Sequence, residues 1–315
     1  MARPHKFKFT QRDSLLLVDL YKHRFLAIRQ LQRLHFPSMQ TAFRRLRLLK
    51  AEGYVTAFSI PSIDESIFTL SGSGLQFVAQ VLGVDRDQLK WSETKARPRD
   101  YYFMRHFLAI NDFRITLRQA CEASGVRLLG FIPDYYGDKV KSGAAAKYIR
   151  DVVCDMAHDR EEVSHTPDGV FALERNGRPA LFFLEIDRGT EVVSNPDKGV
   201  LKSIRFYASY LLDGKYQRYA RDFGVPEFRG FRALCITSTE QRAQRIREAS
   251  SKITSSDKAR RFVWLTTFDA LTIENIFDPI WLSCHHADSS LYSLLGRASN
   301  DTGGNAESLD GGKIK

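Results

Sequence analysis

Three acidic residues in the middle of the chain flank two short apolar segments that we predict to be β-strands. Asp168 precedes the segment 170–173, while Glu185 and Asp187 follow the segment 181–184. Because side chains alternate along a strand, Glu185 and Asp187 share one face, and the turn between the two strands brings Asp168 to the same edge. Clustered carboxylate oxygens bind hard divalent cations, so the pattern predicts a Mg²⁺ site that could assist phosphodiester hydrolysis.

A helix with basic residues is predicted after this acidic edge. Residues 198–212 place apolar side chains at helical spacing, and Lys198 and Lys202 lie on a different stripe of the helix. These lysines are candidates to supply the positive charge that a phosphoryl-transfer site needs. Carboxylates at strand ends beside glycine turns are also common as ordinary solvated groups, so a purely structural role for the acids stays open.

The sequence around these acids resembles the PD-(D/E)xK nuclease superfamily. The resemblance rests on the Pro-Asp pair 167–168 entering one strand and on the Glu-Ile-Asp sequence 185–187 ending the next. It implies a metal-dependent nuclease fold in which Asp168 and Glu185 would bind Mg²⁺. The superfamily has a lysine two residues after the glutamate, where this chain has an aspartate, so either a lysine of the next helix substitutes or the site is degenerate. The candidate catalytic residues are Asp168, Glu185, Asp187, Lys198 and Lys202.

The positive charge of the chain is concentrated near its N-terminus. The whole sequence has 47 Lys and Arg against 37 Asp and Glu, a formal net charge of +10. Residues 1–50 contain 12 of the basic residues and 2 of the acidic ones, which accounts for the entire excess. Concentrated basicity is typical of polyanion binders, and without an amphipathic anchor a nucleic acid is a better partner than a membrane.

Length and composition narrow the class of protein. A chain of 315 residues with 43% hydrophobic residues is expected to form two globular domains. No apolar run is long enough for a membrane span, and the N-terminus lacks the apolar core of a signal peptide, so we expect a cytoplasmic protein with no membrane partner. The four cysteines are widely separated, which indicates neither a disulfide framework nor a zinc ribbon.

Residues 1–83 are predicted to form a DNA-binding domain. Apolar spacing predicts helices at 12–23, 27–35, 39–52 and 74–82, and a β-hairpin at 54–60 and 66–70. In the third helix, Ala42, Phe43, Leu46 and Leu49 are expected on the apolar side. Three helices followed by a hairpin resemble a winged helix-turn-helix, and the passage from Phe43 to Val55, a recognition helix running into the first wing strand, carries this resemblance.

The winged-helix resemblance implies contacts with double-stranded DNA. The start of the third helix of such a domain enters the major groove, where side chains reach base edges. Later basic residues and the arm 3–8 are expected to contact phosphates. Winged helices also serve as protein-binding modules, but the charge distribution favours DNA. The candidate DNA-binding residues are Ser38, Gln40, Thr41, Arg44, Arg45, Arg47 and Lys50.

The rest of the chain predicts a second domain of mixed helix and strand. Residues 84–100 are expected to be a linker, 101–285 a PD-(D/E)xK-like α/β sandwich, and 286–315 a disordered tail. The fold class is therefore α+β or α/β. The second domain is expected to contain helices at 101–123, 198–212 and 239–250, strands at 126–132, 147–156, 170–173, 181–187, 231–237 and 261–266, and a short helix from Asp269.

The combined pattern resembles the bacterial replication-relaxation family over about residues 10–285. The winged-helix pattern, the helix 101–123, the Pro-Asp-Gly sequence 167–169 and the segment 184–191 carry this resemblance. It implies a protein of plasmid or mobile-element replication and DNA relaxation, with plasmid replication or mobilisation proteins as partners. Two functions stay open: a DNA-binding protein with a nuclease-like scaffold, or a Mg²⁺-dependent endonuclease, a nickase, using Asp168 and Glu185. The aspartate at position 187 favours the first.

Overall fold

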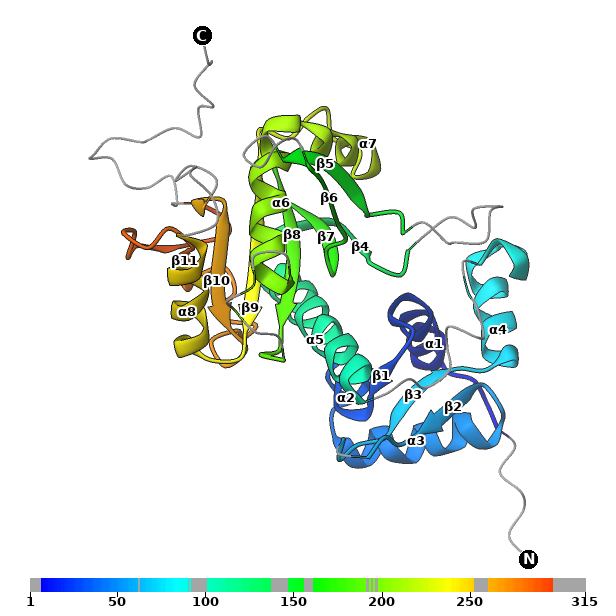
Figure 1. The fold of residues 1–315 in the computed structure, drawn as a ribbon. Helices are drawn as coiled ribbons and strands as arrows, with labels where there is room; N and C mark the ends of the chain where they lie inside the picture. Colours follow the sequence, from blue (N-terminus) through cyan, green and yellow to red (C-terminus); the bar gives the residue numbers. More distant parts are fainter. Residues whose placement is uncertain are drawn as a thin grey trace, which may run out of the picture. The chain divides into compact units, whose positions relative to one another are not determined.

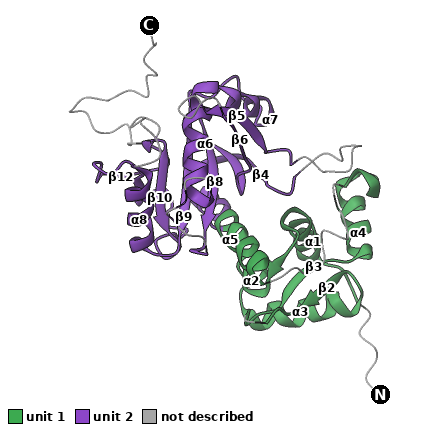
Figure 2. Ribbon diagram, viewed as in Figure 1, with its two compact units in different colours: residues 1–115 green, residues 116–315 purple. Residues whose placement is uncertain are grey.

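The structure is a computed structural model. It describes residues 7–296 apart from 62, 90, 92–100, 137–146, 156–160, 191, 192, 194, 196, 197 and 252–259. The described chain forms two compact units, Met1–Ile115 and Thr116–Lys315 (Figures 1 and 2). The division falls inside the helix α5 (Tyr101–Ser124), whereas the sequence suggested a boundary at the linker 84–100. Most of that predicted linker lies outside the described residues.

Unit 1 has the order of helices and hairpin that the sequence predicted, with a short first strand and a 3-10 turn that were not predicted. Its elements are α1 (Gln11–His23), β1 (Leu26–Ala27), α2 (Ile28–His35), α3 (Met39–Ala51), β2 (Val55–Phe58), β3 (Ile67–Leu70), α4 (Gly72–Leu82) and a 3-10 turn at Arg86–Gln88. The strands form an antiparallel sheet in the order β1-β3-β2. Thr10 begins α1 with a capping box, and Ser38 and Ser71 cap α3 and α4 by accepting backbone hydrogen bonds.

The core of unit 1 is apolar and uses only a narrow stripe of α3. Ala42, Leu46 and Leu49 of α3 are fully buried, at the spacing of one helix face. The sequence placed Phe43 with them, but this prediction is wrong, because the Phe43 side chain is 57% exposed. One residue of α-helix turns the side-chain direction by about 100°, which carries Phe43 away from the buried stripe.

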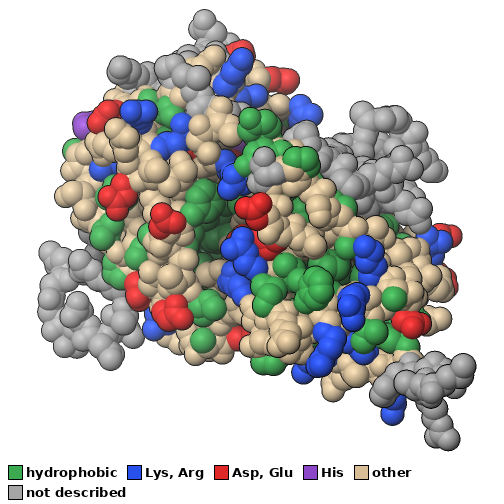
Figure 3. Space-filling view, turned by 90° about the horizontal axis from the view of Figure 1, so that it is seen from below, with side chains coloured by type: hydrophobic (Ala, Val, Ile, Leu, Met, Phe, Trp, Pro, Cys, Tyr) green, Lys and Arg blue, Asp and Glu red, His purple; other side chains and the backbone are tan. Residues whose placement is uncertain are grey.

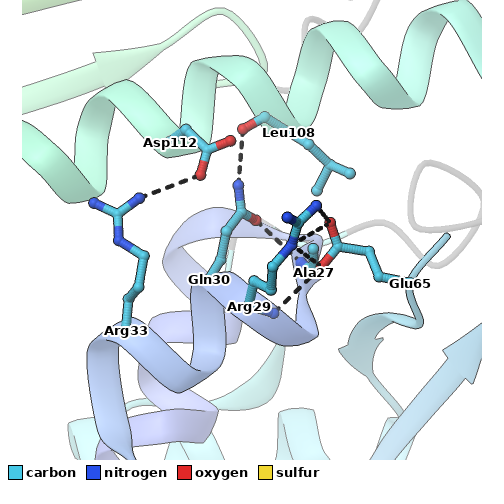
Figure 4. A network of polar contacts seen from close by, with 7 residues as sticks. All are labelled: Ala27, Arg29, Gln30, Arg33, Glu65, Leu108 and Asp112. Atoms are coloured by element: carbon cyan, nitrogen blue, oxygen red, sulfur yellow. Dashed lines mark hydrogen bonds and ion pairs between the residues drawn. The ribbon is translucent and has the colours of Figure 1, made fainter. Parts of the chain in front are cut away.

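Polar contacts in unit 1 join α2 to the first part of α5 (Figure 4). The Gln30 side-chain amide donates to the Leu108 carbonyl oxygen at 2.8 Å, and Arg33 forms an ion pair with Asp112 at 3.5 Å. Gln30 is buried, so its hydrogen bond satisfies a polar group that would otherwise be costly in the core. These contacts explain why residues 101–115 belong with the helices of unit 1.

Unit 2 is built on a mixed sheet of seven strands. The sheet order is β12-β11-β10-β9-β8-β7-β4, with β8, β9 and β10 parallel and the outer pairs antiparallel. Two helices make the parallel crossovers, α6 between β8 and β9, and α8 between β9 and β10 (Figure 1). The elements are β4 (Arg127–Pro133), β7 (Gly169–Arg175), β8 (Arg178–Asp187), α6 (Gly199–Asp213), a 3-10 turn (Lys215–Gln217), α7 (Arg218–Asp222), β9 (Phe231–Thr237), α8 (Glu240–Ser250), β10 (Val263–Thr267), β11 (Trp281–Ser283) and β12 (Leu291–Tyr292), with a separate pair, β5 (Asp151–Asp155) and β6 (Glu161–His165).

The hairpin of β7 and β8 confirms the turn predicted between the two central strands. Arg175 pairs with Arg178, which leaves Asn176 and Gly177 as a two-residue turn. Both turn residues have positive φ, 52° and 73°, and Asn followed by Gly is the pair that tolerates this conformation best. The tight turn fixes the register, so the far ends of β7 and β8 meet at a defined edge.

The second half of the chain departs from the sequence prediction in its last elements. The short helix expected from Asp269 is absent: the chain there forms turns, and Asn275 accepts the Thr272 backbone N–H at 2.8 Å. The strands β6, β11 and β12 were not predicted, because such short segments are stabilised mainly by the neighbouring strand. Since β12 lies within 286–315, the predicted disordered tail is wrong at its start, and 297–315 lie outside the described residues.

Aromatic side chains dominate the core on the face of the large sheet that packs against α6. Phe183 of β8 contacts the rings of Tyr207 and Tyr210 of α6 at centroid distances of 5.4 and 5.7 Å, and Phe231 of β9 at 4.9 Å. Aromatic pairs of this kind stabilise a core beyond the area that they bury. The packing of the sheet against α6 therefore fixes the position of side chains at the end of β8.

None of the described helices is long and apolar enough to cross a bilayer.

Candidate functional site

Glu185, near the end of β8, is the centre of a polar cluster on the α6 side of the sheet. Its Oε1 accepts a hydrogen bond from the Tyr207 hydroxyl at 2.5 Å and lies 2.7 Å from His165 Nε2 of β6. The Glu185 and His165 side chains are only 14% and 13% exposed. Burial and the nearby Glu185 charge raise the pKa of Tyr207 well above its ordinary value of 10.0, so this buried hydroxyl stays protonated and acts as a donor.

Asp168 is placed beside Glu185 by the strand register. Gly169, the first residue of β7, pairs with Leu184, so Asp168 just before the strand stands opposite Glu185. The Asp168 backbone N–H donates to the Leu184 carbonyl at 2.9 Å, and its Oδ2 accepts the Ile186 N–H at 2.7 Å. The Asp168 charge also contributes to the raised pKa of Tyr207. The structure thus brings two of the three predicted acids to one edge.

Asp187, at the end of β8, forms an ion pair with an arginine of α8. Arg242 of α8 donates from its Nη2 to Asp187 Oδ1 at 2.8 Å and from its Nε to Oδ2. The Thr237 hydroxyl also donates to Oδ2, at 2.9 Å. Both side chains of the ion pair are largely buried. Two-point contact between arginine and carboxylate is strong and geometrically specific, so Asp187 joins the end of β8 to α8.

The two candidate lysines lie at the start of α6. Lys198 is the exposed residue before the helix, and Lys202, one turn later, is half-buried. Neither ammonium group forms an ion pair with Asp168, Glu185 or Asp187 within the described residues. Asp187 is paired instead with Arg242, which was not among the predicted site residues.

The carboxylates of the predicted Mg²⁺ site have protein partners in this structure. Within the described ranges no three His, Cys, Asp or Glu side chains are grouped so that they could hold a metal ion. One oxygen of Glu185 already accepts hydrogen bonds from two side chains, and both oxygens of Asp187 contact Arg242. A Mg²⁺ ion bound through Oε1 of Glu185 or through Asp187 would have to displace these partners, because its ligands are direct oxygen contacts.

The exposed face of α3 carries most of the predicted DNA-binding residues. Ser38 begins the helix, and its Oγ accepts the Thr41 backbone N–H at 3.3 Å. Figure 3 views the side on which α3 lies and shows Lys and Arg side chains interleaved with hydrophobic ones. Exposed cations on one helix are the feature expected of a polyanion-binding surface. The exposed candidates are Ser38, Gln40, Arg44, Arg47 and Lys50, while Thr41 and Arg45 are half-buried.

Arg45 differs from its neighbours, because it binds an acid of α1. Its Nε donates to Asp13 Oδ1 at 2.7 Å, its Nη2 also contacts Asp13, and the guanidinium lies 4.9 Å from the centre of the Phe7 ring. Burial alone would raise the pKa of Asp13, but hydrogen bonds from Arg45 and Thr10 outweigh it and lower the pKa below the ordinary 3.8. Arg45 thus ties α3 to α1.

A pocket lies between the beginning of α1 and α3, next to the Asp13–Arg45 pair. Since Arg45 offsets the charge of Asp13, Arg12 and Arg44 give the pocket a net positive charge. The Thr10 hydroxyl donates to Asp13 at 2.7 Å, which leaves the Thr41 hydroxyl as the group that can donate to an oxyanion. The lining residues are Thr10, Arg12, Asp13, Thr41, Arg44, Arg45 and Leu48.

Comparison with protein families connects this geometry with a group of known proteins. A family model described as replication-relaxation matches residues 17–225. The chain belongs to the replication-relaxation family. A search of curated proteins found no match. Membership in the replication-relaxation family connects the chain with the replication of plasmids or other mobile elements, and the match covers α3 as well as the acidic edge.

Several side-chain partners of the predicted site residues were not predicted from the sequence. His165 lies on β6, a strand that was not predicted, and Tyr207 was counted only among the residues of a helix. Arg242 is 55 positions from Asp187, so no local pattern could pair them. Asp13 had a usable signal: Thr10 three residues before an acid predicts a capping box, although not the ion pair with Arg45.

Proposed function

We propose that the protein binds duplex DNA through α3 during the replication of a plasmid or another mobile element. One observation carries the proposal: α3 presents Arg44, Arg47 and Lys50 to solvent from a helix whose opposite side is fully buried. The order of three helices and a hairpin, with the sheet β1-β3-β2, supports a winged helix, in which this helix enters the major groove.

The residues of α3 have different proposed roles. Gln40 and Arg44 near the start of the helix are assigned to base edges, since both side chains can form paired hydrogen bonds in the major groove. Arg47 and Lys50 are assigned to phosphates, which give affinity with little sequence choice. Ser38 and Thr41 shape the helix start, and Arg45 positions α3 through its contact with Asp13.

The pocket beside α3 suits a backbone phosphate. Arg12 can approach a phosphate in the pocket, and the Thr41 hydroxyl can hydrogen-bond to the same group. Such a contact would fix the register of the protein on DNA without reading sequence. The pocket therefore complements the base contacts assigned to the exposed face of α3.

Duplex binding by the full chain at several salt concentrations tests this proposal. Affinity is expected to fall steeply with salt, because each neutralised phosphate releases counterions. Arg44→Ala and Arg47→Ala should weaken binding, whereas Arg178→Ala should not, since Arg178 is an exposed arginine at the tip of the β7–β8 hairpin. Salt-independent binding, or equal losses for all three variants, would contradict the assignment to α3.

We further propose that unit 2 is a nuclease-like domain with a non-catalytic, structural role. The element order α5, β4, β7, β8, α6, β9, with β8 parallel to β9, supports the PD-(D/E)xK resemblance. The non-catalytic role is supported by the engaged carboxylates, because Glu185 is bonded to His165 and Tyr207, and Asp187 is neutralised by Arg242.

A Mg²⁺-dependent nickase is the second candidate, favoured by the cross-strand placement of Asp168 opposite Glu185. When bound, the metal would polarise the phosphoryl group and activate water. Incubating supercoiled plasmid with the full chain and Mg²⁺ tests it. Nicking that Asp168→Asn and Glu185→Gln abolish, and that the exposed-site variant Glu162→Gln keeps, would establish catalysis and overturn the structural role.

A further inference from the structure

The exposed face of α3 is apolar as well as basic. Met39 and Phe43 lie one helical turn apart and are 40% and 57% exposed. Phe43 is followed at once by Arg44 and, one turn later, by Arg47. The core of unit 1 does not use Phe43, because Ala42, Leu46 and Leu49 supply the buried side of α3. The aromatic ring is therefore available to a partner that also meets the arginines.

A large exposed aromatic side chain in the middle of a basic helix face is informative. Keeping a phenylalanine in water gives up the favourable burial that the same side chain would have in a core. The cations around it require a partner with negative charge, and residues 1–50 carry the whole net charge of +10. The partner must therefore offer both negative charge and apolar surface within a few ångströms.

The major groove of duplex DNA meets both requirements. Phosphates line its rims, and the C5-methyl group of each thymine projects into it as an isolated apolar surface. A helix in the groove that brings Arg44 to base edges and Arg47 to phosphates carries Phe43 and Met39 along the base edges. Phenylalanine cannot form a hydrogen bond with a base edge, so its favourable contact there is with a methyl group.

We propose that Phe43, with Met39 beside it, reads thymine methyl groups and thereby determines which DNA sites the protein prefers. The inference rests on the proposed duplex binding by α3. It adds a specificity determinant that no basic residue provides, because arginine and lysine cannot distinguish thymine from uracil by its methyl group. A site bound by this protein should then contain at least one thymine whose methyl group is required.

Replacing thymine by uracil tests the inference, since uracil lacks only the methyl group. Preferred sites are first selected from a random duplex pool with the full chain, and then resynthesised with deoxyuridine at one thymine position at a time. Affinity is measured by fluorescence anisotropy. At one or two positions the substitution should weaken binding about three-fold or more, the effect of burying one methyl group.

Variants connect that loss with the proposed side chain. Phe43→Ala should bind thymine and uracil duplexes equally, whereas Phe43→Leu, which keeps an apolar side chain, should retain part of the difference. Leu212→Ala, a change at an exposed leucine of α6, should leave the difference as in the original protein. Thermal unfolding of Phe43→Ala should match the unsubstituted chain, because the side chain is outside the core.

The outcomes separate this inference from the proposed function. If no duplex binds the full chain, DNA binding by α3 itself fails. If selected sites bind but no uracil substitution changes affinity, or if Phe43→Ala keeps the thymine preference, the methyl readout fails and DNA binding stands. If Phe43→Ala instead binds all duplexes unchanged and loses a protein contact, Phe43 serves a protein partner and the inference is overturned.

Discussion

Unit 1 and unit 2 each contain a cluster of charged side chains, which is exposed in unit 1 and largely buried in unit 2. On α3 the cations of Arg44, Arg47 and Lys50 point into solvent. At the end of β8 the carboxylates of Glu185 and Asp187 are largely buried and bonded to side chains of neighbouring elements. A charge that the fold keeps exposed is available to a ligand, whereas a charge that the fold satisfies internally contributes to structure.

The same contrast occurs between two adjacent residues of α3. Arg44 is exposed beside the pocket, and Arg45 is bound to Asp13, whose side chain is 0% exposed. Residue type therefore does not decide which arginine is available to a ligand, because position around the helix does. Substitutions in both units and at both arginines test whether the exposed and the buried charges have these separate roles.

Arg45→Ala is expected to have the largest effect on stability. It leaves the buried carboxylate of Asp13 without its cation, and breaking a buried ion pair costs about 3 kcal/mol or more. Arg44→Ala should change the free energy of unfolding by less than about 0.5 kcal/mol, because its side chain is exposed. Urea unfolding of the two variants measures both values. Equal destabilisation would show that Arg44 and Arg45 are not divided between binding and structure.

Arg242→Ala makes the corresponding test in unit 2. The loss of unfolding free energy should approach about 3 kcal/mol. The Asp187 side chain is only 11% exposed, so water can replace little of the interaction with the guanidinium. The double variant Asp187→Asn with Arg242→Ala should recover part of that loss. Duplex affinity should stay unchanged in both. A stable Arg242→Ala protein would imply that the ion pair is not structural and would reopen a ligand role for Asp187.

Arg44→Ala should weaken binding selectively for the preferred DNA site, by about 1–3 kcal/mol. Arg47→Ala and Lys50→Ala should instead weaken binding to specific and random duplexes alike. Each should also reduce the slope of log affinity against log salt concentration by about one. Anisotropy titrations on both kinds of duplex distinguish the two patterns. Equal losses on specific and random DNA for Arg44→Ala would assign Arg44 to a phosphate.

Local sequence patterns predicted much of the fold, because the residues that determine each of these elements lie close together in the chain. The hairpin of β7 and β8 followed from Asn176 and Gly177, which tolerate positive φ. The strand β9 was predicted with its observed bounds, 231–237, since its apolar run is bounded by glycine and polar residues. Where periodicity, turn residues and caps agree, the sequence alone was sufficient.

The parts that were not predicted depend on contacts between distant residues. Arg242 meets Asp187 only because α8 returns beside β8, and His165 meets Glu185 only because β6 forms. Phe43 was assigned to the core because its type is apolar, although the narrow buried stripe of α3 left no room for it. The type of a residue determines neither which side chain a charged group will contact nor how wide the buried face of a helix will be.

The smallest expected effect is the pH dependence that the Asp13–Arg45 pair gives to unit 1. The pKa of Asp13 is lowered in the folded state, so the unfolded chain binds a proton more readily than the folded one. The contribution of Asp13 to stability is therefore complete above its ordinary value of 3.8 and is lost as the pH falls below 3.8 towards the lowered pKa.

Urea unfolding at a series of pH values between about 6 and 3 measures this contribution, since acid protonates carboxylates that the fold holds ionised. The unsubstituted chain should lose stability more steeply at the acid end than Asp13→Asn, which cannot titrate at this position. Asp64→Asn is the matched control, because Asp64 lies in unit 1 outside the core and should leave the acid dependence unchanged. Parallel acid profiles for the unsubstituted chain and Asp13→Asn would mean that Arg45 does not hold Asp13 ionised. Arg45 would then return to the DNA-binding face with Arg44, and the division between structural and binding arginines on α3 would disappear.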